Sequence, residues 1–382
     1  MSEAEVIPIG SHGRPGRGAG RKTTPSAAAR ALAPSPRVKK ARRAAAPPAH
    51  PDPIRTESRE TRPPDEPVVD DNRTGARTAP QPDSLPAPGF DIAGALSGAA
   101  QEVFGEAWET RLAEFLAFCR RRLTGDYEID DYGFDSEFAD RFILTALRPL
   151  AQKWFRVEVR GIENIPPDGG ALVVANHSGT VPLDALMTGL VVHDHAGRHL
   201  RMLGADLVFR LPFVGQLARK GGATLASNED AERMLAEGEL VGVWPEGFKG
   251  IGKPFSERYK LQRFGRGGFV SAALRTGVPI VPCSIVGAEE IYPLIGNVPA
   301  LARLLGVPYV PITPLFPWLG ILGMVPLPSK WLIEFGEPIR TDSYALRAAD
   351  DPMLVFNLTD QVRETIQQTL YTLLMKRRGV FF

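Results

Sequence analysis

Four short apolar runs, each followed by a turn of glycine or polar residues, constrain the fold of this chain more than any other feature. The runs read ALVVANH at 171–177, ELVGVWPEG at 239–247, VPIVPCSIVG at 278–287 and WLIEFGE at 331–337. Continuous apolar runs of this length are typical of strands buried on both faces, as in parallel sheets. Helical patterns alternate with them, so the sequence predicts an α/β fold with a largely parallel, mixed sheet flanked by helices.

Weaker patterns complete this alternation. Further strands are predicted within 155–161, 199–205 and 222–227, and helices from Pro182 to about Val192, over 211–221, over 227–238 and from Asp351-Pro352 onward. The helix over 227–238 has both boundary signals, because Ser227 or Asn228 can cap its start and Gly238 follows its end.

The N-terminal region has a different composition. Residues 1–88 are rich in Pro, Ala and Arg and poor in large apolar side chains, so we predict a disordered basic arm. Its first fifty residues hold ten Lys and Arg against Glu3 and Glu5. A solvated tail is one interpretation of these charges, and contact with nucleic acid or anionic lipid is the other. No nucleic-acid partner is expected, since the arm lacks the interleaved aromatics of a single-strand binder.

Residues 89–154 are predicted to form amphipathic helices between the arm and the sheet. Apolar residues recur at spacings of three and four from about Gln101 to Leu123, and again from Ser136. Arg120, Arg121 and Arg122 suit the end of the first helix. Pro149 is expected to kink or end the second helix, because proline disrupts the hydrogen bonding of a helix interior.

The chain is predicted to be cytoplasmic and peripherally associated with the inner face of a membrane. It has two cysteines, and its N-terminus lacks the apolar core of a secretory signal. The stretch 304–328 is apolar, but the five prolines inside it, before the final Pro328, argue against a membrane span. It is expected to form an acyl groove, a membrane contact or a packed loop.

A histidine and an aspartate follow the first of the four runs. His177 leaves the predicted strand, and Asp184 lies in the first turn of the next helix. Such a pair suits a general base with an orienting carboxylate. The alternative is structural, because a helix dipole also favours Asp184 and His177 can be an ordinary loop residue. The chain has no Gly-x-Ser-x-Gly motif, so the nucleophile is expected to be a hydroxyl of the substrate.

A second group of histidines, His193, His195 and His199, lies between a predicted helix and a predicted strand. No carboxylate or cysteine pattern accompanies it in the sequence, so a solvated turn is predicted there and no metal site.

Three blocks in order resemble the glycerolipid and lysophospholipid acyltransferase superfamily, and most closely its monoacylglycerol and diacylglycerol acyltransferase-like branch. They are VVANHSGTVPLDALM, then FVGQLARKGGATLASNEDAERMLAEGELVGVWPEGFKG, then RFGRGGFVSAALRTGVPIVPCSIVGAEE, within residues 155–340. The resemblance implies that 155–382 is an acyltransferase domain and that acyl-CoA is a co-substrate with no further cofactor. It also implies that His177 deprotonates a lipid hydroxyl with Asp184 as its partner.

The resemblance further implies substrate contacts and leaves the acceptor open. Glu246 and Gly247 occupy the family's Glu-Gly block, which is implicated in acceptor binding. The basic residues that follow it are expected to meet the phosphates of coenzyme A or to form a solvated loop; they include Lys249, Lys253, Arg263 and Arg266.

Two departures from the family pattern bear on the pair and on the acceptor. Six residues separate His177 from Asp184 where the family commonly has four, and Ala226-Ser227 replaces an arginine thought to grip an acceptor phosphate. A mono- or diacylglycerol-like acceptor is therefore predicted. A phosphorylated acceptor such as lysophosphatidate, or a non-catalytic lipid-binding protein, is the alternative.

Overall fold

The computed structural model describes residues 108–305 and 307–381. These fall into two compact units, which divide between Tyr127 and Glu128. The predicted arm at 1–88 and the start of the first predicted helix lie outside the described residues. Helix α3 (Trp108–Thr124) belongs to the first unit and agrees with the rest of that prediction.

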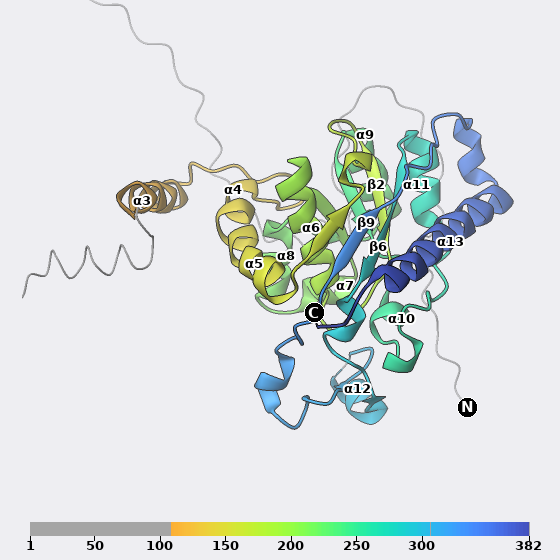
Figure 1. Ribbon diagram of the computed structural model, residues 1–382. Coiled ribbons are helices and arrows are strands. Elements are labelled where there is room, and N and C mark those ends of the chain that lie inside the picture. Colours follow the sequence, from red (N-terminus) through yellow and green to blue (C-terminus); the bar gives the residue numbers. More distant parts are fainter. Residues whose placement is uncertain (1–107, 306, 382) are drawn as a thin grey trace, which may run out of the picture. The chain divides into compact units, whose positions relative to one another are not determined.

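A seven-stranded mixed sheet forms the centre of the second unit (Figure 1). Its strands are β1 (Glu158–Arg160), β2 (Ala171–Ala175), β3 (Leu200–Gly204), β4 (Thr224–Leu225), β5 (Leu240–Val243), β6 (Ile280–Val286) and β9 (Leu332–Phe335). Their order across the sheet is β1-β9-β6-β2-β5-β3-β4, and every pair is parallel except β6 with β9. The predicted α/β class with a largely parallel sheet is confirmed.

Four helices pack on the two faces of this sheet. They are α6 (Leu183–Ala196), α9 (Asn228–Ala236), α11 (Gly268–Thr276) and α13 (Pro352–Lys376). Helix α8 (Val214–Lys220) lies between β3 and β4 in the chain. Shorter elements are α4 (Ser136–Phe138), α5 (Thr145–Pro149), α7 (Asp206–Arg210), α10 (Phe248–Ile251), α12 (Pro299–Leu305) and the small hairpin of β7 (Gly296–Asn297) with β8 (Pro311–Ile312). The 3-10 turns are η3 (Ile162–Asn164), η4 (Phe255–Glu257), η5 (Ala288–Glu290), η6 (Gly320–Met324) and η7 (Leu346–Asp350).

Strand β2 explains why the core has two halves. Successive side chains of a strand point to opposite faces. Leu172 and Val174 pack with residues of α9, α11 and α13, whereas Ala171, Val173 and Ala175 pack with residues of α6 and the segment before β1. All five residues are buried, as the uninterrupted apolar run predicts.

The segment before β1 is a continuous helix of changing pitch. Two π-helical stretches, η1 (Ala139–Leu144) and η2 (Leu150–Trp154), alternate with α4 and α5. Pro149 was expected to kink or end the helix. It does not end the helix, because the helical segment continues through η2 to Trp154. Ala151 and Leu144 of this segment join the core.

Candidate active site

The two motif loops meet because their strands are neighbours. Strands β2 and β5 pair in parallel, so the loops that follow them leave the same edge of the sheet. His177 comes two residues after β2, and Glu246 comes three residues after β5. The loops are in contact, because the His177 N–H donates a hydrogen bond of 2.9 Å to Glu246 Oε1.

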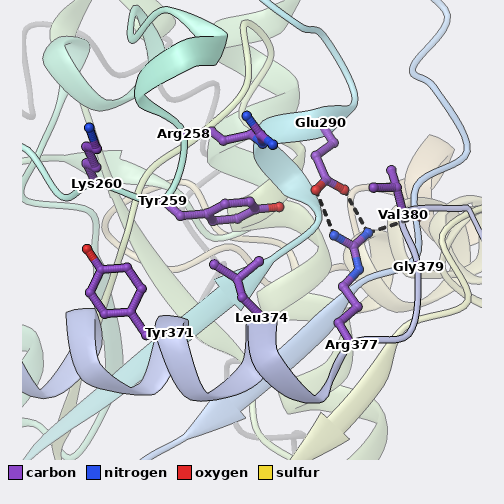
Figure 2. Close-up of a pocket in the computed structure, with 9 residues that line it drawn as sticks. All are labelled: Arg258, Tyr259, Lys260, Glu290, Tyr371, Leu374, Arg377, Gly379 and Val380. Atoms are coloured by element: carbon purple, nitrogen blue, oxygen red, sulfur yellow. Dashed lines mark hydrogen bonds and ion pairs between the residues drawn. The ribbon is translucent and has the colours of Figure 1, made fainter.

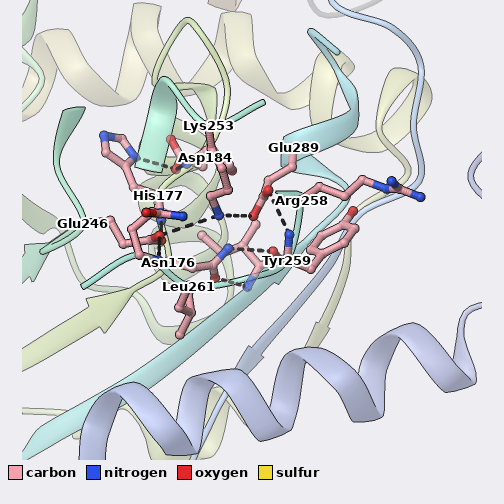
Figure 3. A network of polar contacts seen from close by, with 12 residues as sticks. Asn176, His177, Asp184, Glu246, Lys253, Arg258, Tyr259, Leu261 and Glu289 are labelled. Atoms are coloured by element: carbon pink, nitrogen blue, oxygen red, sulfur yellow. Dashed lines mark hydrogen bonds and ion pairs between the residues drawn. The ribbon is translucent and has the colours of Figure 1, made fainter. Parts of the chain in front are cut away.

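His177 and Asp184 form the pair that the sequence predicts. The distance from His177 Nδ1 to Asp184 Oδ2 is 2.7 Å, and the loop of six residues between them still brings the side chains together (Figure 3). Asp184 is fully buried, and it also accepts hydrogen bonds from the N–H groups of Ser178 and Ala185. An aspartate with these partners keeps a proton on His177 Nδ1 and leaves Nε2 able to accept one.

Asn176, directly before His177, fixes the end of β2. The Asn176 amide donates to the carbonyl of Ile285 at 3.0 Å and accepts from the N–H of Ile285 at 2.7 Å, which ties the end of β2 to β6. The His177 side chain keeps 15% exposure, so its ring is reachable from outside. The chain next to the pair is therefore held in place by Asn176, and the imidazole is accessible, as a general base requires.

Glu246 and Lys253 belong to a buried polar network under the histidine (Figure 3). Glu246 Oε2 accepts the Gln262 N–H at 2.6 Å and lies 3.6 Å from Lys253 Nζ, which in turn lies 3.1 Å from Glu289 Oε1. The side chains of Lys253 and Glu246 are 2% and 0% exposed. Burial raises the pKa of the Glu289 carboxyl to about 7, against the opposing effect of Lys253.

Glu246 and Lys253 were predicted to contact substrates, but in this network both contact other groups of the protein. Glu246 holds the backbone of His177 and of Gln262, and the ammonium of Lys253 lies between two carboxylates. The geometry supports a positioning role for both residues. Nothing in the sequence distinguished this from substrate binding, because the atoms that Glu246 contacts belong to the backbone of a distant loop.

The remaining predicted residues lie on the connection between β5 and α11. Gly247 begins α10 with a positive φ of 55°, a conformation that glycine adopts without strain. Lys249, Arg263 and Arg266 are exposed on the segments that follow β5. Their contact with coenzyme A stays a prediction.

A cavity of about 420 Å³ lies apart from the histidine (Figure 2). It is lined by Arg258, Tyr259, Lys260, Glu290, Tyr371, Leu374, Arg377, Gly379 and Val380. An ion pair of 2.7 Å between Arg377 and Glu290 closes one side, and Arg258 points away from His177 in the view of Figure 3. The cavity is therefore not the space in front of the imidazole.

The histidine group after the motif differs from its prediction. His193 lies inside α6, and the structure brings the Asp140 carboxylate of η1 to within 3.3 Å of His193 Nε2 and 3.5 Å of His199 Nε2. The predicted solvated turn is therefore wrong for His193 and His199, which are partly buried. Burial also lowers the pKa of the His199 imidazole.

The comparison with known proteins, and not the geometry of the site alone, gives the family of this chain. The family model described as "Acyltransferase" matches residues 156–286. The chain is 61% identical to uncharacterized protein Rv0502 of Mycobacterium tuberculosis over 283 residues, which cover 72% of this chain and 79% of the relative. The chain belongs to the glycerolipid acyltransferase superfamily.

More distant similarities carry descriptive names. The human protein named "DGAT1/2-independent enzyme synthesizing storage lipids" is 29% identical over 147 residues, or 38% of this chain and 45% of that protein. A solved structure, the 1-acyl-sn-glycerophosphate acyltransferase PlsC from Thermotoga maritima, has 22% identity and a TM-score of 0.42, with 64% of this chain and 84% of that chain covered.

Proposed function

We propose that this protein transfers a fatty acyl group from acyl-CoA to a hydroxyl group of a lipid, with His177 as the general base. The observation that carries the proposal is the 2.7 Å contact between His177 Nδ1 and the buried Asp184 carboxylate, which leaves Nε2 on the accessible side of the ring. Membership of an acyltransferase family supports the reaction class.

Each step of the proposed reaction follows from this arrangement. His177 Nε2 takes the proton of the acceptor hydroxyl, and the hydroxyl oxygen attacks the carbonyl carbon of the thioester. The tetrahedral intermediate then collapses, the carbon–sulfur bond breaks, and the leaving coenzyme A thiolate takes the proton back from Nε2. Asp184 stabilises the imidazolium that exists between the two proton transfers. These steps use acyl-CoA as a co-substrate and need no metal ion or other cofactor.

The exposed cations between β5 and α11 suit the phosphates of coenzyme A. Lys249 lies on α10, next to the His177 loop, and Arg263 and Arg266 follow on the same connection between β5 and α11. Exposed guanidinium and ammonium groups bind phosphate through charge-assisted hydrogen bonds. Lys253 is left out of this set, because it is buried between two carboxylates.

An uncharged acceptor suits the site better than a phosphorylated one. Ser227 is used locally, since its Oγ caps α9 by accepting the Asp230 N–H. Arg219, a nearby candidate for phosphate binding, is 3% exposed and places its guanidinium 4.8 Å from the centre of the Phe209 ring. It would have to leave this packing to reach a headgroup. We therefore propose a mono- or diacylglycerol-like acceptor.

An acceptor panel tests this choice. Labelled acyl-CoA is offered with monoacylglycerol, diacylglycerol, lysophosphatidate or glycerol 3-phosphate, and kcat/KM is compared. We expect a preference of roughly tenfold or more for the uncharged acceptors, because a missing contact to a charged group typically costs about 1.5 to 3 kcal/mol. A clear preference for lysophosphatidate that disappears in Lys249→Ala or Arg219→Ala would show that another cation has taken over phosphate binding.

Peripheral attachment to the inner face of the cytoplasmic membrane completes the proposal. Within the described residues, no helix is both long and apolar enough to cross a membrane. Large apolar side chains of the 304–328 stretch are exposed, among them Trp318 at 74% and Leu322 at 70%. Figure 1 shows α12, at the start of this stretch, projecting beyond the sheet on the same side as α10. These side chains favour a membrane contact over a closed acyl groove.

A further inference from the structure

Asp140, His193 and His199 bring three potential metal ligands together at a place remote from the proposed chemistry. They come from η1, from the last turn of α6 and from the residue before β3. Their ligand atoms all lie within 4.8 Å of one another. Asp184 lies at the opposite end of α6, so this cluster is separate from the proposed active site.

The spacing of these atoms fits a metal ion better than it fits hydrogen bonds. Asp140 Oδ1 is 3.3 Å from His193 Nε2 and 3.5 Å from His199 Nε2, and this oxygen is buried without a hydrogen-bond partner. Two ligands of a tetrahedral Zn²⁺ ion, each about 2.0 to 2.1 Å from the metal, are about 3.3 Å apart. Both separations from Asp140 Oδ1 are close to that value, and the ligand nitrogens of the two histidines lie within 4.8 Å of each other.

The neighbours of His193 fix which of its nitrogens faces the cluster. Its Nδ1 lies 3.2 Å from Asp194 Oδ1, and Arg148 holds the Asp194 carboxylate with contacts of 2.8 and 3.0 Å. Because this carboxylate accepts the proton of Nδ1, the lone pair of Nε2 points toward Asp140. In the neutral ring, two lone-pair acceptors then face each other, which is unfavourable unless a metal cation lies between them or a second proton charges the ring. Carboxylate–histidine–metal arrangements use this orientation.

We propose that Asp140, His193 and His199 bind a Zn²⁺ ion, with Asp194 orienting His193 and water at the fourth position. Two imidazoles and one carboxylate favour zinc over Mg²⁺ or Ca²⁺, which prefer oxygen ligands. The ion joins the π-helical turn η1 to α6 and β3. Its role is structural, and it takes no part in acyl transfer. π-Helical turns often occur at functional sites, in agreement with a ligand on η1.

Zinc binding by the full-length, tag-free protein tests the proposal. After chelation and dialysis, Zn²⁺ titration is followed by calorimetry and by thermal unfolding. We expect one equivalent to bind with a micromolar or lower Kd and to raise Tm. Asp140→Asn, which keeps the side-chain shape, and His199→Gln should each weaken binding at least about tenfold. His195→Gln is the matched control, because His195 is exposed on the same helix and outside the cluster.

Two results would overturn the proposal. One is the absence of stoichiometric binding to folded wild-type protein, which would leave Asp140 paired with a protonated histidine instead. The other is an equal loss of binding in His195→Gln and His199→Gln, which would indicate non-specific capture by exposed histidines. A His177→Ala variant should bind zinc like the wild type, so the result is independent of the proposed catalytic function.

Discussion

At the scale of single residues, His177 is positioned by two carboxylates that act on different parts of it. Asp184 accepts the ring Nδ1–H, and Glu246 accepts the backbone N–H. Asp184 sets the tautomer, whereas Glu246 fixes where the loop holds the imidazole. Lys253 lies beside Glu246 and offsets part of the cost of burying its charge.

Replacing Glu246 tests this positioning role. Glu246→Gln keeps an acceptor for the His177 N–H but removes the charge that faces Lys253 and one acceptor for the Gln262 N–H. We expect kcat to fall about tenfold to a hundredfold with little change in KM, and stability to fall by about 1 to 3 kcal/mol. Glu257→Gln is the exposed control and should match the wild type. A variant that raises KM alone would identify Glu246 as a substrate contact.

The sequence predicted the contact between His177 and Asp184 better than the contacts around it. A histidine after a buried strand and an aspartate in the first turn of the next helix are close in the sequence, so the local pattern was enough to pair them. Asp140 could not be linked to His193 from the sequence, because 52 residues separate them and only the packing of η1 against α6 brings them together. Long-range contacts of this kind leave no local pattern.

At the scale of elements, α10 packs so closely on the His177 loop that only glycine fits at one position. A Cβ at Gly250 would lie 2.8 Å from His177 O and 2.8 Å from Glu246 Cβ. This helix follows directly from β5, so its contact with the loop after β2 determines how the two motif loops meet. The glycine in the Glu-Gly-Phe-Lys-Gly block therefore has a steric explanation.

Adding one methyl group at this contact tests the packing. Gly250→Ala should push α10 away from the His177 loop, lower stability by about 1 to 3 kcal/mol and reduce acyl transfer. Gly265→Ala is the matched control, since the nearest atom to a Cβ there is 4.0 Å away and stability should change by less than about 0.5 kcal/mol. Thermal unfolding and turnover are measured for both. Equal behaviour of the two variants would contradict the close contact.

The strands of the main sheet were predicted well, whereas helix α11 and the short helices α7, α10 and α12 were missed. The buried strands stand out because continuous apolar runs have few alternatives once prolines and glycines bound them. Helix α11 begins at Gly268 after Gly267, whose φ of 75° ends the preceding loop. Such a start lacks the polar cap that marks α9. The prediction that Pro149 can end the helix assumed α-helical hydrogen bonding throughout. The stretch after Pro149 is π-helical, with bonds between residues five apart, and the helix continues.

At the scale of the whole molecule, the exposed apolar side chains of the 304–328 stretch are expected to place the protein on a membrane. Changing both Trp318 and Leu322 to Ser should weaken binding to anionic vesicles at least about tenfold, because each buried apolar side chain contributes roughly 1.5 to 3 kcal/mol. Met375→Ser, at an exposed apolar position on α13, is the control. High salt or carbonate should release the wild type. Vesicle binding that is unchanged in the double variant would refute this contact.

The measurement that tests the central claim most directly is acyl transfer by folded His177 variants. Turnover of labelled acyl-CoA with monoacylglycerol is compared for the wild type, His177→Ala, Asp184→Asn and the control His195→Ala. We predict that His177→Ala loses at least about a hundredfold in kcat, that Asp184→Asn is nearly as damaging, and that the control is unaffected. Circular dichroism should be the same for all four proteins. Wild-type turnover by a folded His177→Ala protein would contradict the account.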